Sequence, residues 1–293
     1  EKERFPRFHI GESLMTETYW VLQKIGVLDR LKASEFPRKY SVQFFSASGK
    51  PSKPFYFRDH APHESSVTWQ VERSEFDRLL LENATSRGAD VRMGAKVEKV
   101  LFEDGEPSLP ASGPTAGHAE GRATGVRGTY EDGREFRISC DVVVDASGLG
   151  SILARQLGLA RKDPKLDKAA VYAHFEGAQR DPGIDEGATL VISTKDHRGW
   201  FWYIPLSRDR VSVGVVASAR DLLKDRGAPE KVLEAEIAEC SAVRDRLAKA
   251  RRVSPVRVTG DYTWRSTRCG GEGYVLIGDA FGFIDPLYPS GVL

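Results

Sequence analysis

The chain has 293 residues, of which 40% are hydrophobic and 29% are charged, and its formal net charge is +1 at pH 7. This composition is typical of a globular protein, and the small net charge excludes a general electrostatic attraction to nucleic acid or to anionic membranes. No apolar run is long enough to insert stably into a membrane, and the first residues do not resemble a signal peptide. The three scattered cysteines form no metal or disulfide pattern, so we expect buried or half-buried thiols in a reducing cytoplasm.

The first part of the chain alternates short helices with a hairpin. Apolar residues at helical spacing predict two short helices within 13–32, separated by Gly26. Residues 40–45 alternate as a half-buried strand does, and 55–57 predict its hairpin partner. A longer helix is expected over 74–88, because Ser74 and Gly88 are typical of its two ends.

The middle of the chain reads as a meander followed by a strand that leads into a helix. Three strands are predicted at 97–102, 123–130 and 135–138, and the insert 103–122 reads as a surface loop without function. The apolar strand 141–145 then runs into the small residues of 146–150 and a helix at 151–157.

The last part of the chain changes character. Several strands between 171 and 216 follow one another without intervening helices, which predicts a second, antiparallel-sheet domain. A helix is expected over 230–248, and 274–277 form a short buried strand. The fold class is therefore α/β with α+β elements.

No strand in this chain leads into Gly-x-Gly-x-x-Gly at the start of a helix. If the protein binds a dinucleotide, we expect the first strand and the phosphate loop to lie upstream of Glu1. The chain would then be a fragment cut at both ends.

The residues after the 274–277 strand point to a flavin site. Asp279 lies at the carboxyl end of that strand, where α/β sheets bind ligands, and its carboxylate can accept hydrogen bonds from sugar or ribityl hydroxyls. Ser290 and Gly291 read as the first turn of a helix, whose N–H groups favour negative charge such as that of a reduced flavin ring.

Several motifs occur in one order along almost the whole chain: Phe5-Pro6-Arg7 with Gly11-Glu12-Ser13-Leu14, Phe36-Pro37-Arg38-Lys39-Tyr40, Gln70-Val71-Glu72-Arg73, Asp145-Ala146-Ser147-Gly148, Trp200-Phe201-Trp202-Tyr203-Ile204-Pro205, and Gly278-Asp279 with Asp285-Pro286 and Ser290-Gly291. Together they resemble the flavin-dependent halogenases, within the wider group of aromatic flavoprotein monooxygenases and geranylgeranyl reductases. The resemblance implies an FAD-binding Rossmann-like domain formed by 1–35, 70–165 and 266–293. It implies a substrate-binding domain formed by 36–69 and 166–265.

The resemblance implies that Lys39 is the counterpart of the family's essential lysine. Hypohalous acid is a diffusible and unselective oxidant, and a desolvated amine can hold it by hydrogen bonding or as a haloamine. Burial would lower the lysine pKa and favour the neutral nucleophile. Without the resemblance, a lysine beside Arg38 is typical of a solvated surface.

The resemblance implies that FAD is the cofactor, with Glu1 on the adenosine ribose and Arg73 near the pyrophosphate. Without it, Glu1 would be a frayed terminal residue and Arg73 an exposed arginine at a helix start. The residues assigned to the cofactor are Glu1, Arg7, Gln70, Arg73, Asp145, Ala146, Gly148, Gly278, Asp279, Pro286 and Gly291.

The residues assigned to halide or substrate are Trp200, Trp202, Tyr288, Ser290 and Gly291. Trp200 and Trp202 face the same side of a strand, either as a wall near the flavin or as an aromatic stripe in a core. Tyr288 stands where tryptophan halogenases carry a glutamate that serves the indole, so the resemblance favours phenol- or pyrrole-type substrates, often bound to a carrier protein. No histidine spacing predicts a metal site.

The leading hypothesis is an FAD-dependent halogenase that uses O2, halide and FADH2 from a separate flavin reductase. One alternative is an FAD-dependent monooxygenase or reductase on the same scaffold. Another is an inactive truncated chain, or an interaction module, that binds FAD weakly.

Overall fold

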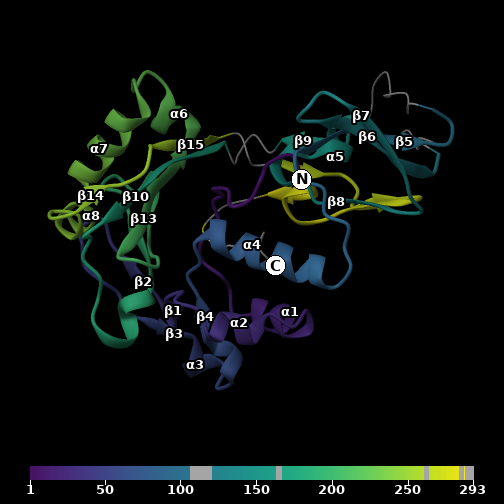
Figure 1. The fold of residues 1–293 in the computed structure, drawn as a ribbon. Coiled ribbons are helices and arrows are strands. Elements are labelled where there is room, and N and C mark those ends of the chain that lie inside the picture. Colours follow the sequence, from purple (N-terminus) through teal and green to yellow (C-terminus); the bar gives the residue numbers. More distant parts are fainter. Residues whose placement is uncertain (106–120, 163–166, 261–263, 284–286, 288–293) are drawn as a thin grey trace. The chain divides into compact units, whose positions relative to one another are not determined.

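The structure is a computed structural model of residues 1–293, and it describes residues 1–105, 121–162, 167–260, 264–283 and 287. The chain folds into two compact units, each with its own sheets (Figure 1). Unit 1 contains Glu1–Arg7, Leu81–Pro164 and Thr263–Ile284, and unit 2 contains Phe8–Leu80 and Lys165–Tyr262.

The boundaries of the units differ from the expected domain boundaries, most of all in the first part of the chain. Residues 8–35 and 70–80, grouped by the sequence with the FAD-binding domain, pack within unit 2. The reason is a shared core, in which Leu14, Trp69 and Phe76 are buried together. The assignment of FAD to one unit and substrate to the other stays a prediction.

A large sheet forms the centre of unit 2, in the order β14-β10-β13-β12-β11-β2-β3, with β15 also paired to β10. Its strands are β2 (Ser41–Phe45), β3 (Phe55–Tyr56), β10 (Lys168–Glu176), β11 (Thr189–Ser193), β12 (Gly199–Pro205), β13 (Arg210–Ser218), β14 (Arg251–Arg252) and β15 (Arg257–Gly260). The predicted antiparallel strands and the β2–β3 hairpin are confirmed. One pairing was not predicted: β11 runs parallel to β2, with Thr189 opposite Val42.

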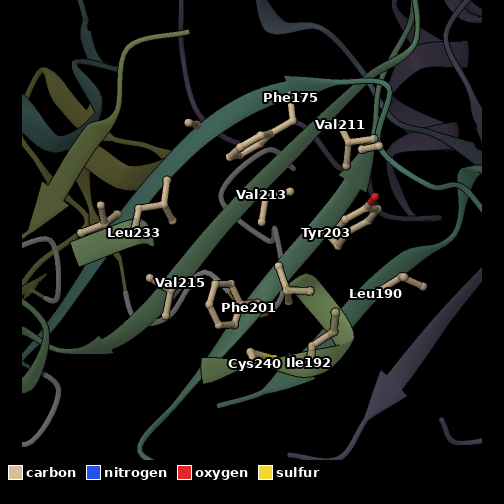
Figure 2. Close-up of a cluster of buried hydrophobic side chains, with 14 of the residues drawn as sticks. Phe175, Leu190, Ile192, Phe201, Tyr203, Val211, Val213, Val215, Leu233 and Cys240 are labelled. Carbon is tan, nitrogen blue, oxygen red and sulfur yellow. The ribbon is translucent and has the colours of Figure 1, made fainter. Parts of the chain in front are cut away.

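Alternation along the strands builds the core of this sheet, as Figure 2 shows. Val211, Val213 and Val215 of β13 point to one face, where they pack with Phe201 and Tyr203 of β12. Three helices cover that face: α6 (Ala219–Leu223), α7 (Pro229–Glu239) and α8 (Ser241–Arg246). Burial of this apolar surface is the main stabilisation of unit 2.

The single helix expected over 230–248 is wrong. Cys240 separates α7 from α8 because its backbone is extended (φ −103°, ψ 99°). Its side chain is buried in the core, so the break follows from packing. Cys140 and Cys269 are exposed, contrary to the expectation of buried thiols.

The N-terminal part of unit 2 is helical and packs around small strand pairs. The two short helices on either side of Gly26 are confirmed as α1 and α2, and Gly26 has a positive φ of 72° that suits glycine. The elements here are α1 (Thr18–Lys24), α2 (Leu28–Lys32), β1 (Arg38–Lys39), α3 (Phe57–His60), β4 (Thr68–Trp69) and α4 (Arg73–Ser86), whose last residues belong to unit 1.

The described residues of unit 1 form three small sheets, and the predicted meander is confirmed as β5-β6-β7. The predicted strands at 141–145 and 274–277 are confirmed as β8 and β18, which pair in parallel. Its elements are β5 (Ala95–Phe102), β6 (Ala123–Tyr130), β7 (Glu135–Ser139), β8 (Val143–Asp145), α5 (Ile152–Gln156), β9 (Ala160–Lys162), β16 (Trp264–Ser266), β17 (Gly270–Gly271), β18 (Tyr274–Leu276) and β19 (Gly282–Phe283). Most of the insert 103–122 lies outside the described residues.

Candidate active site

Lys39 is buried, which contradicts its alternative interpretation as a solvated surface lysine. Its side chain lies inside unit 2, and only 4% of the residue is exposed. Nζ donates to Ser13 Oγ at 2.9 Å and to the Leu14 carbonyl at 3.2 Å, and it lies 5.4 Å from the centre of the Phe57 ring. Burial lowers the pKa of Lys39 from 10.5 to about 7, and the Glu17 carboxylate opposes this shift. A substantial fraction of the amine is therefore neutral at neutral pH.

Two short pairings bring the neighbours of Lys39 together. β1 pairs with β4, which places Lys39 opposite Thr68. The next residue after β4, Gln70, forms an antiparallel bridge with Ser13. The segment that contains Ser13 therefore lies beside the strand that carries the lysine.

A chain of polar side chains runs from Lys39 into the large sheet. Ser13 Oγ lies 3.1 Å from Thr189 Oγ1, and Gln70 Nε2 donates to that same Thr189 oxygen at 2.8 Å. Gln70 Nε2 also donates to the carbonyl of Gly187 at 2.9 Å. The amide nitrogen of Gln70, which the resemblance assigns to the cofactor, is thus engaged within unit 2.

An aromatic hollow of about 350 Å³ is lined in part by Phe57, the ring that Lys39 contacts. We use this name for the space lined by Glu17, Trp20, Phe55, Phe57, His60 and Ser65, among others. The Phe55 and His60 rings stack at 4.2 Å with an angle of 11°. Phe57 lines the hollow and also contacts Lys39, so one side chain joins the two.

Sequence reasoning missed the aromatic hollow, because it treated 55–57 only as a strand. Trp20 and Phe55 are 52% and 47% exposed, which is unusual for large aromatic side chains. The density of aromatic residues over 55–60 was the available signal. Their gathering around one space depends on tertiary contacts between α1, β3 and α3.

Trp200 and Trp202 lie on the same side of β12, as the alternation predicts. Their ring centres are 6.3 Å apart, at an angle of 56°. Trp202 is buried with Tyr172, and its Nε1 donates to Ser212 Oγ at 3.0 Å. Trp202 therefore packs in a core, and Trp200 lies half-buried at its border.

A buried acid–histidine pair lies on the same face of the large sheet. Glu12 Oε1 is 2.7 Å from His174 Nε2, and both side chains are almost fully buried. The Phe8 ring lies 5.7 Å from the His174 ring, and the Arg257 guanidinium lies over Phe8 at 3.8 Å. This pair was not predictable from residue spacing, because its two members are far apart in the chain.

Arg73 is held within unit 2 and is not an exposed arginine. Its guanidinium makes two hydrogen bonds to the Asp77 carboxylate, at 2.6 and 3.0 Å, and donates to the carbonyl of Ile10. The guanidinium therefore ties the first turn of α4 to the segment that precedes Glu12. Its predicted role at a pyrophosphate stays a prediction.

In unit 1, the turns that follow β8 and β18 lie at the same sheet edge, because the two strands are parallel neighbours. Asp145 is buried, and its two carboxylate oxygens accept from the backbone N–H groups of Ser147 and Leu153 at 2.9 and 2.8 Å. The carboxylate of Asp145 therefore shapes the turn that contains Ala146 and Gly148.

This edge fits the cofactor that the resemblance implies. A Cβ placed at Gly148 would meet no atom within 4 Å, so the space beside this turn is open. Gly148 and Gly278 both have positive φ values, 61° and 54°. Asp279 follows Gly278 in a 3₁₀ turn. Glycine turns at the carboxyl ends of parallel strands allow a dinucleotide to approach the backbone closely.

Glu1 is held by hydrogen bonds within unit 1, so it is not a frayed terminal residue. Its carbonyl accepts from Ala95 N at 3.0 Å, and its amino group donates to the Arg92 carbonyl at 3.0 Å. The Arg7 guanidinium lies 3.6 Å from the Glu1 carboxylate and 3.5 Å from that of Glu3. Both residues therefore belong to one charged cluster.

Pro286, Tyr288, Ser290 and Gly291 lie outside the described residues. Within the described residues, no group of histidine, cysteine, aspartate and glutamate side chains has an arrangement that could hold a metal ion. The helices in that part of the chain are all too short or too polar to cross a membrane.

Comparison with known proteins gives consistent matches. The profile of one family, described as tryptophan halogenase, matches residues 57–293. A 1H-pyrrole-2-carbonyl-(peptidyl-carrier protein) chlorinase of Pseudomonas fluorescens is 30% identical over 317 residues, covering 100% of this chain and 66% of the chlorinase. The corresponding brominase of Pseudoalteromonas luteoviolacea is 30% identical over 297 residues, again covering 100% of this chain and 66% of the relative.

Solved structures agree with this result. The myxobacterial chondrochloren halogenase CndH, an FAD-dependent halogenase, superposes with a TM-score of 0.86 at 35% identity, covering 100% of this chain and 64% of that protein. The chain thus spans about two thirds of the length of these relatives. The matches confirm the resemblance to flavin-dependent halogenases and the α/β fold class with a Rossmann-like part. The chain belongs to the tryptophan halogenase family.

Proposed function

We propose that the protein halogenates an aromatic substrate of the phenol or pyrrole type, using reduced FAD, O2 and halide. The observation that carries this proposal is the buried Lys39 amine, whose pKa lies near 7 and which shares Phe57 with an aromatic hollow. The pyrrole class is supported by the two relatives whose names specify a pyrrole-2-carbonyl group on a carrier protein.

FAD would be held at the glycine turns that contain Asp145, Ala146, Gly148, Gly278 and Asp279, with Glu1, Arg7, Gln70, Arg73, Pro286 and Gly291 assigned to it by the family resemblance. When bound, reduced FAD supplies the two electrons that reduce O2, so that halide is oxidised to hypohalous acid and water is released. A separate flavin reductase would supply FADH2.

Lys39 would direct the oxidant to carbon. The neutral amine attacks the halogen of hypohalous acid, forming an N–halogen bond and releasing water. The aromatic carbon then takes the halogen and loses its proton, which restores the amine. In the protonated state, Lys39 can instead hold hypohalous acid by donating a hydrogen bond. A pKa near 7 makes both states available.

We place the substrate ring in the aromatic hollow. Stacking on aromatic side chains favours a planar ring, and Glu17 can accept a hydrogen bond from a phenol hydroxyl or a pyrrole N–H. Trp200 does not line this hollow, and the family resemblance alone assigns it, together with Trp202, to a wall near the flavin. Tyr288, Ser290 and Gly291 complete the predicted halide and substrate set.

The test is product analysis by mass spectrometry with FADH2, O2 and either chloride or bromide. The probes are a pyrrole-2-carbonyl thioester on a carrier protein and a simple phenol. We expect a product mass that changes with the halide, and we expect the variant Lys39→Ala to lose this product while it keeps bound flavin. A hydroxylated product without halide dependence would instead support a monooxygenase.

The matched control is Lys96→Ala, which removes a lysine whose side chain is 66% exposed on β5. We expect this variant to halogenate at the unmodified rate. Equal loss of product in both lysine variants would contradict a specific role for Lys39.

A further inference from the structure

We propose that Ser13 is a positioning residue for the Lys39 amine, and that Thr189, fixed by Gln70, allows the Ser13 hydroxyl to serve both charge states of that amine. The inference concerns side chains of unit 2 alone. It rests on the proposed function only for its consequence in halogen transfer.

The orientation of the Gln70 side chain is fixed by the backbone. The Gly187 carbonyl can only accept, so the group that faces it must be the amide nitrogen of Gln70, at 2.9 Å. The second N–H of the same nitrogen then points to Thr189 Oγ1, at 2.8 Å. Thr189 Oγ1 is therefore an acceptor from Gln70 in every state of the site.

The proton positions follow when Lys39 is charged. An ammonium group has donors only, so Nζ donates to Ser13 Oγ at 2.9 Å and to the Leu14 carbonyl at 3.2 Å. The Ser13 proton then points to Thr189 Oγ1, 3.1 Å away, which has a second lone pair for it. Each hydrogen bond in this state stabilises the positive charge.

The same atoms serve the neutral amine when two hydroxyl groups turn. The lone pair on Lys39 Nζ accepts a hydrogen bond from the Ser13 hydroxyl. Ser13 Oγ in turn accepts a hydrogen bond from the Thr189 hydroxyl. Gln70 continues to donate to Thr189, so no heavy atom needs to move. This series of hydrogen bonds ends at the Gln70 amide, which does not take up a proton. The two hydroxyl groups therefore reorient with the charge on Lys39 but do not carry protons away from it.

The hydroxyl groups of Ser13 and Thr189 matter for the Lys39 amine because the site is buried. Ser13 is 5% exposed and Gln70 is fully buried, so water does not replace either partner readily. Glu17 is the charged group that acts on Lys39 from the neighbouring segment, and it favours the ammonium. The hydroxyl of Ser13 and the carbonyl of Leu14 are the direct contacts.

The test is a titration of the Lys39 amine by NMR, in the full chain labelled with ¹³C at lysine Cε. The signal of Lys39 is the one missing in Lys39→Met. We expect Ser13→Ala to lower the Lys39 pKa by roughly one to two units, because the ammonium loses a charge-assisted hydrogen bond. This readout does not require FAD, halide or substrate.

A pair of variants at Thr189 provides the matched control. Thr189→Val keeps the shape but removes the hydroxyl, which leaves the Ser13 proton without its acceptor, and we expect a fall of roughly half a unit. Thr189→Ser keeps the hydroxyl and should keep the pKa. If Ser13→Ala fails to fold, the comparison of the two Thr189 variants decides.

An unchanged Lys39 pKa in folded Ser13→Ala or Thr189→Val would overturn the proposal. Equal shifts in Thr189→Val and Thr189→Ser would also overturn it, because the hydroxyl would then be irrelevant. If the protein halogenates, the pH profile of the reaction should move with the NMR pKa. Absence of halogenation in all variants, with the pKa shifts intact, would contradict the proposed function and not this inference.

Discussion

The indole of Trp202 occupies the space that a side chain at Gly214 would fill. The two residues lie opposite each other on β12 and β13, and a Cβ at Gly214 would stand 2.3 Å from the indole. A glycine at this position is therefore what allows Trp202 to lie flat across the neighbouring strand.

Gly214→Ala should destabilise the protein by about 1–3 kcal/mol, because the added methyl group overpacks the site. The measurement is the free energy of unfolding in denaturant. Gly260→Ala is the matched control, since its Cβ would lie at an ordinary 3.7 Å from the nearest atom, Ala169 Cβ. Equal losses in the two variants would contradict the steric explanation.

Lys39 should make stability depend on pH in an unusual direction. Burial lowers its pKa from 10.5 to about 7, so between these values the unfolded chain binds more protons than the folded chain. Stability should therefore rise from pH 7 to pH 10, by an amount on the order of 3–4 kcal/mol from this group. Below pH 7 the full cost of the buried charge is present.

Lys39→Met tests this dependence, because it removes the amine and keeps the volume. The variant should be more stable than the unmodified protein at pH 7, and the difference should shrink towards pH 10. Parallel pH curves for the two proteins would show that Lys39 titrates normally.

Glu17→Gln should lower the pKa of Lys39 further, by roughly half a unit, because the carboxylate favours the ammonium. The NMR titration of lysine Cε measures this shift. Glu131→Gln is the control, since Glu131 pairs with Arg4 in unit 1. A higher pKa in Glu17→Gln would contradict the direction assigned to this carboxylate.

Asp77→Asn should destabilise the protein by about 1–3 kcal/mol, because it leaves the mostly buried Arg73 guanidinium without its charged partner. Asp90→Asn breaks an exposed pair with Arg92 and should cost much less stability. Thermal unfolding distinguishes the two. Similar falls in the unfolding temperature of both variants would contradict the role that we assign to the burial of the Arg73–Asp77 pair.

Trp20→Ala and Phe55→Ala should each raise the KM for an aromatic substrate by up to about tenfold, because each removes a stacking surface of the aromatic hollow. The control is Val21→Ala, on the same helix as Trp20 and 45% exposed. Unchanged KM values in both aromatic variants would place the substrate elsewhere.

Much of the fold follows from local pattern. The alternation in 40–45 and the helical spacing around Gly26 each predict the observed element, because the spacing of apolar residues differs between strands and helices. The break at Cys240 was not predictable, since residues on both sides favour helix and the interruption depends on packing against the sheet.

The site was less predictable than the fold. The identity of Lys39 came from a resemblance, and its burial depends on Ser13 and Phe57, which lie far from it in the chain. The engagement of Gln70 and Arg73 with their own unit could not be predicted, because neither Gly187 nor Ile10 has a side chain that marks a hydrogen-bond partner. Every residue has a backbone carbonyl, so the residue type does not indicate which carbonyl will accept a hydrogen bond. That depends on the path of the backbone in the folded protein.

The parallel pairing of β2 with β11 also constrains how the protein reaches its native state. Val42 and Thr189 pair across a loop of roughly 150 residues. Closing so long a loop costs conformational entropy, and this cost precedes the favourable contacts between the two strands. Thr189 is also the residue that orients Ser13 toward the lysine. The hydroxyl of Thr189 should therefore reach Ser13 later in folding than Ser13 and Leu14, which are nearer to Lys39 in the chain, reach the amine.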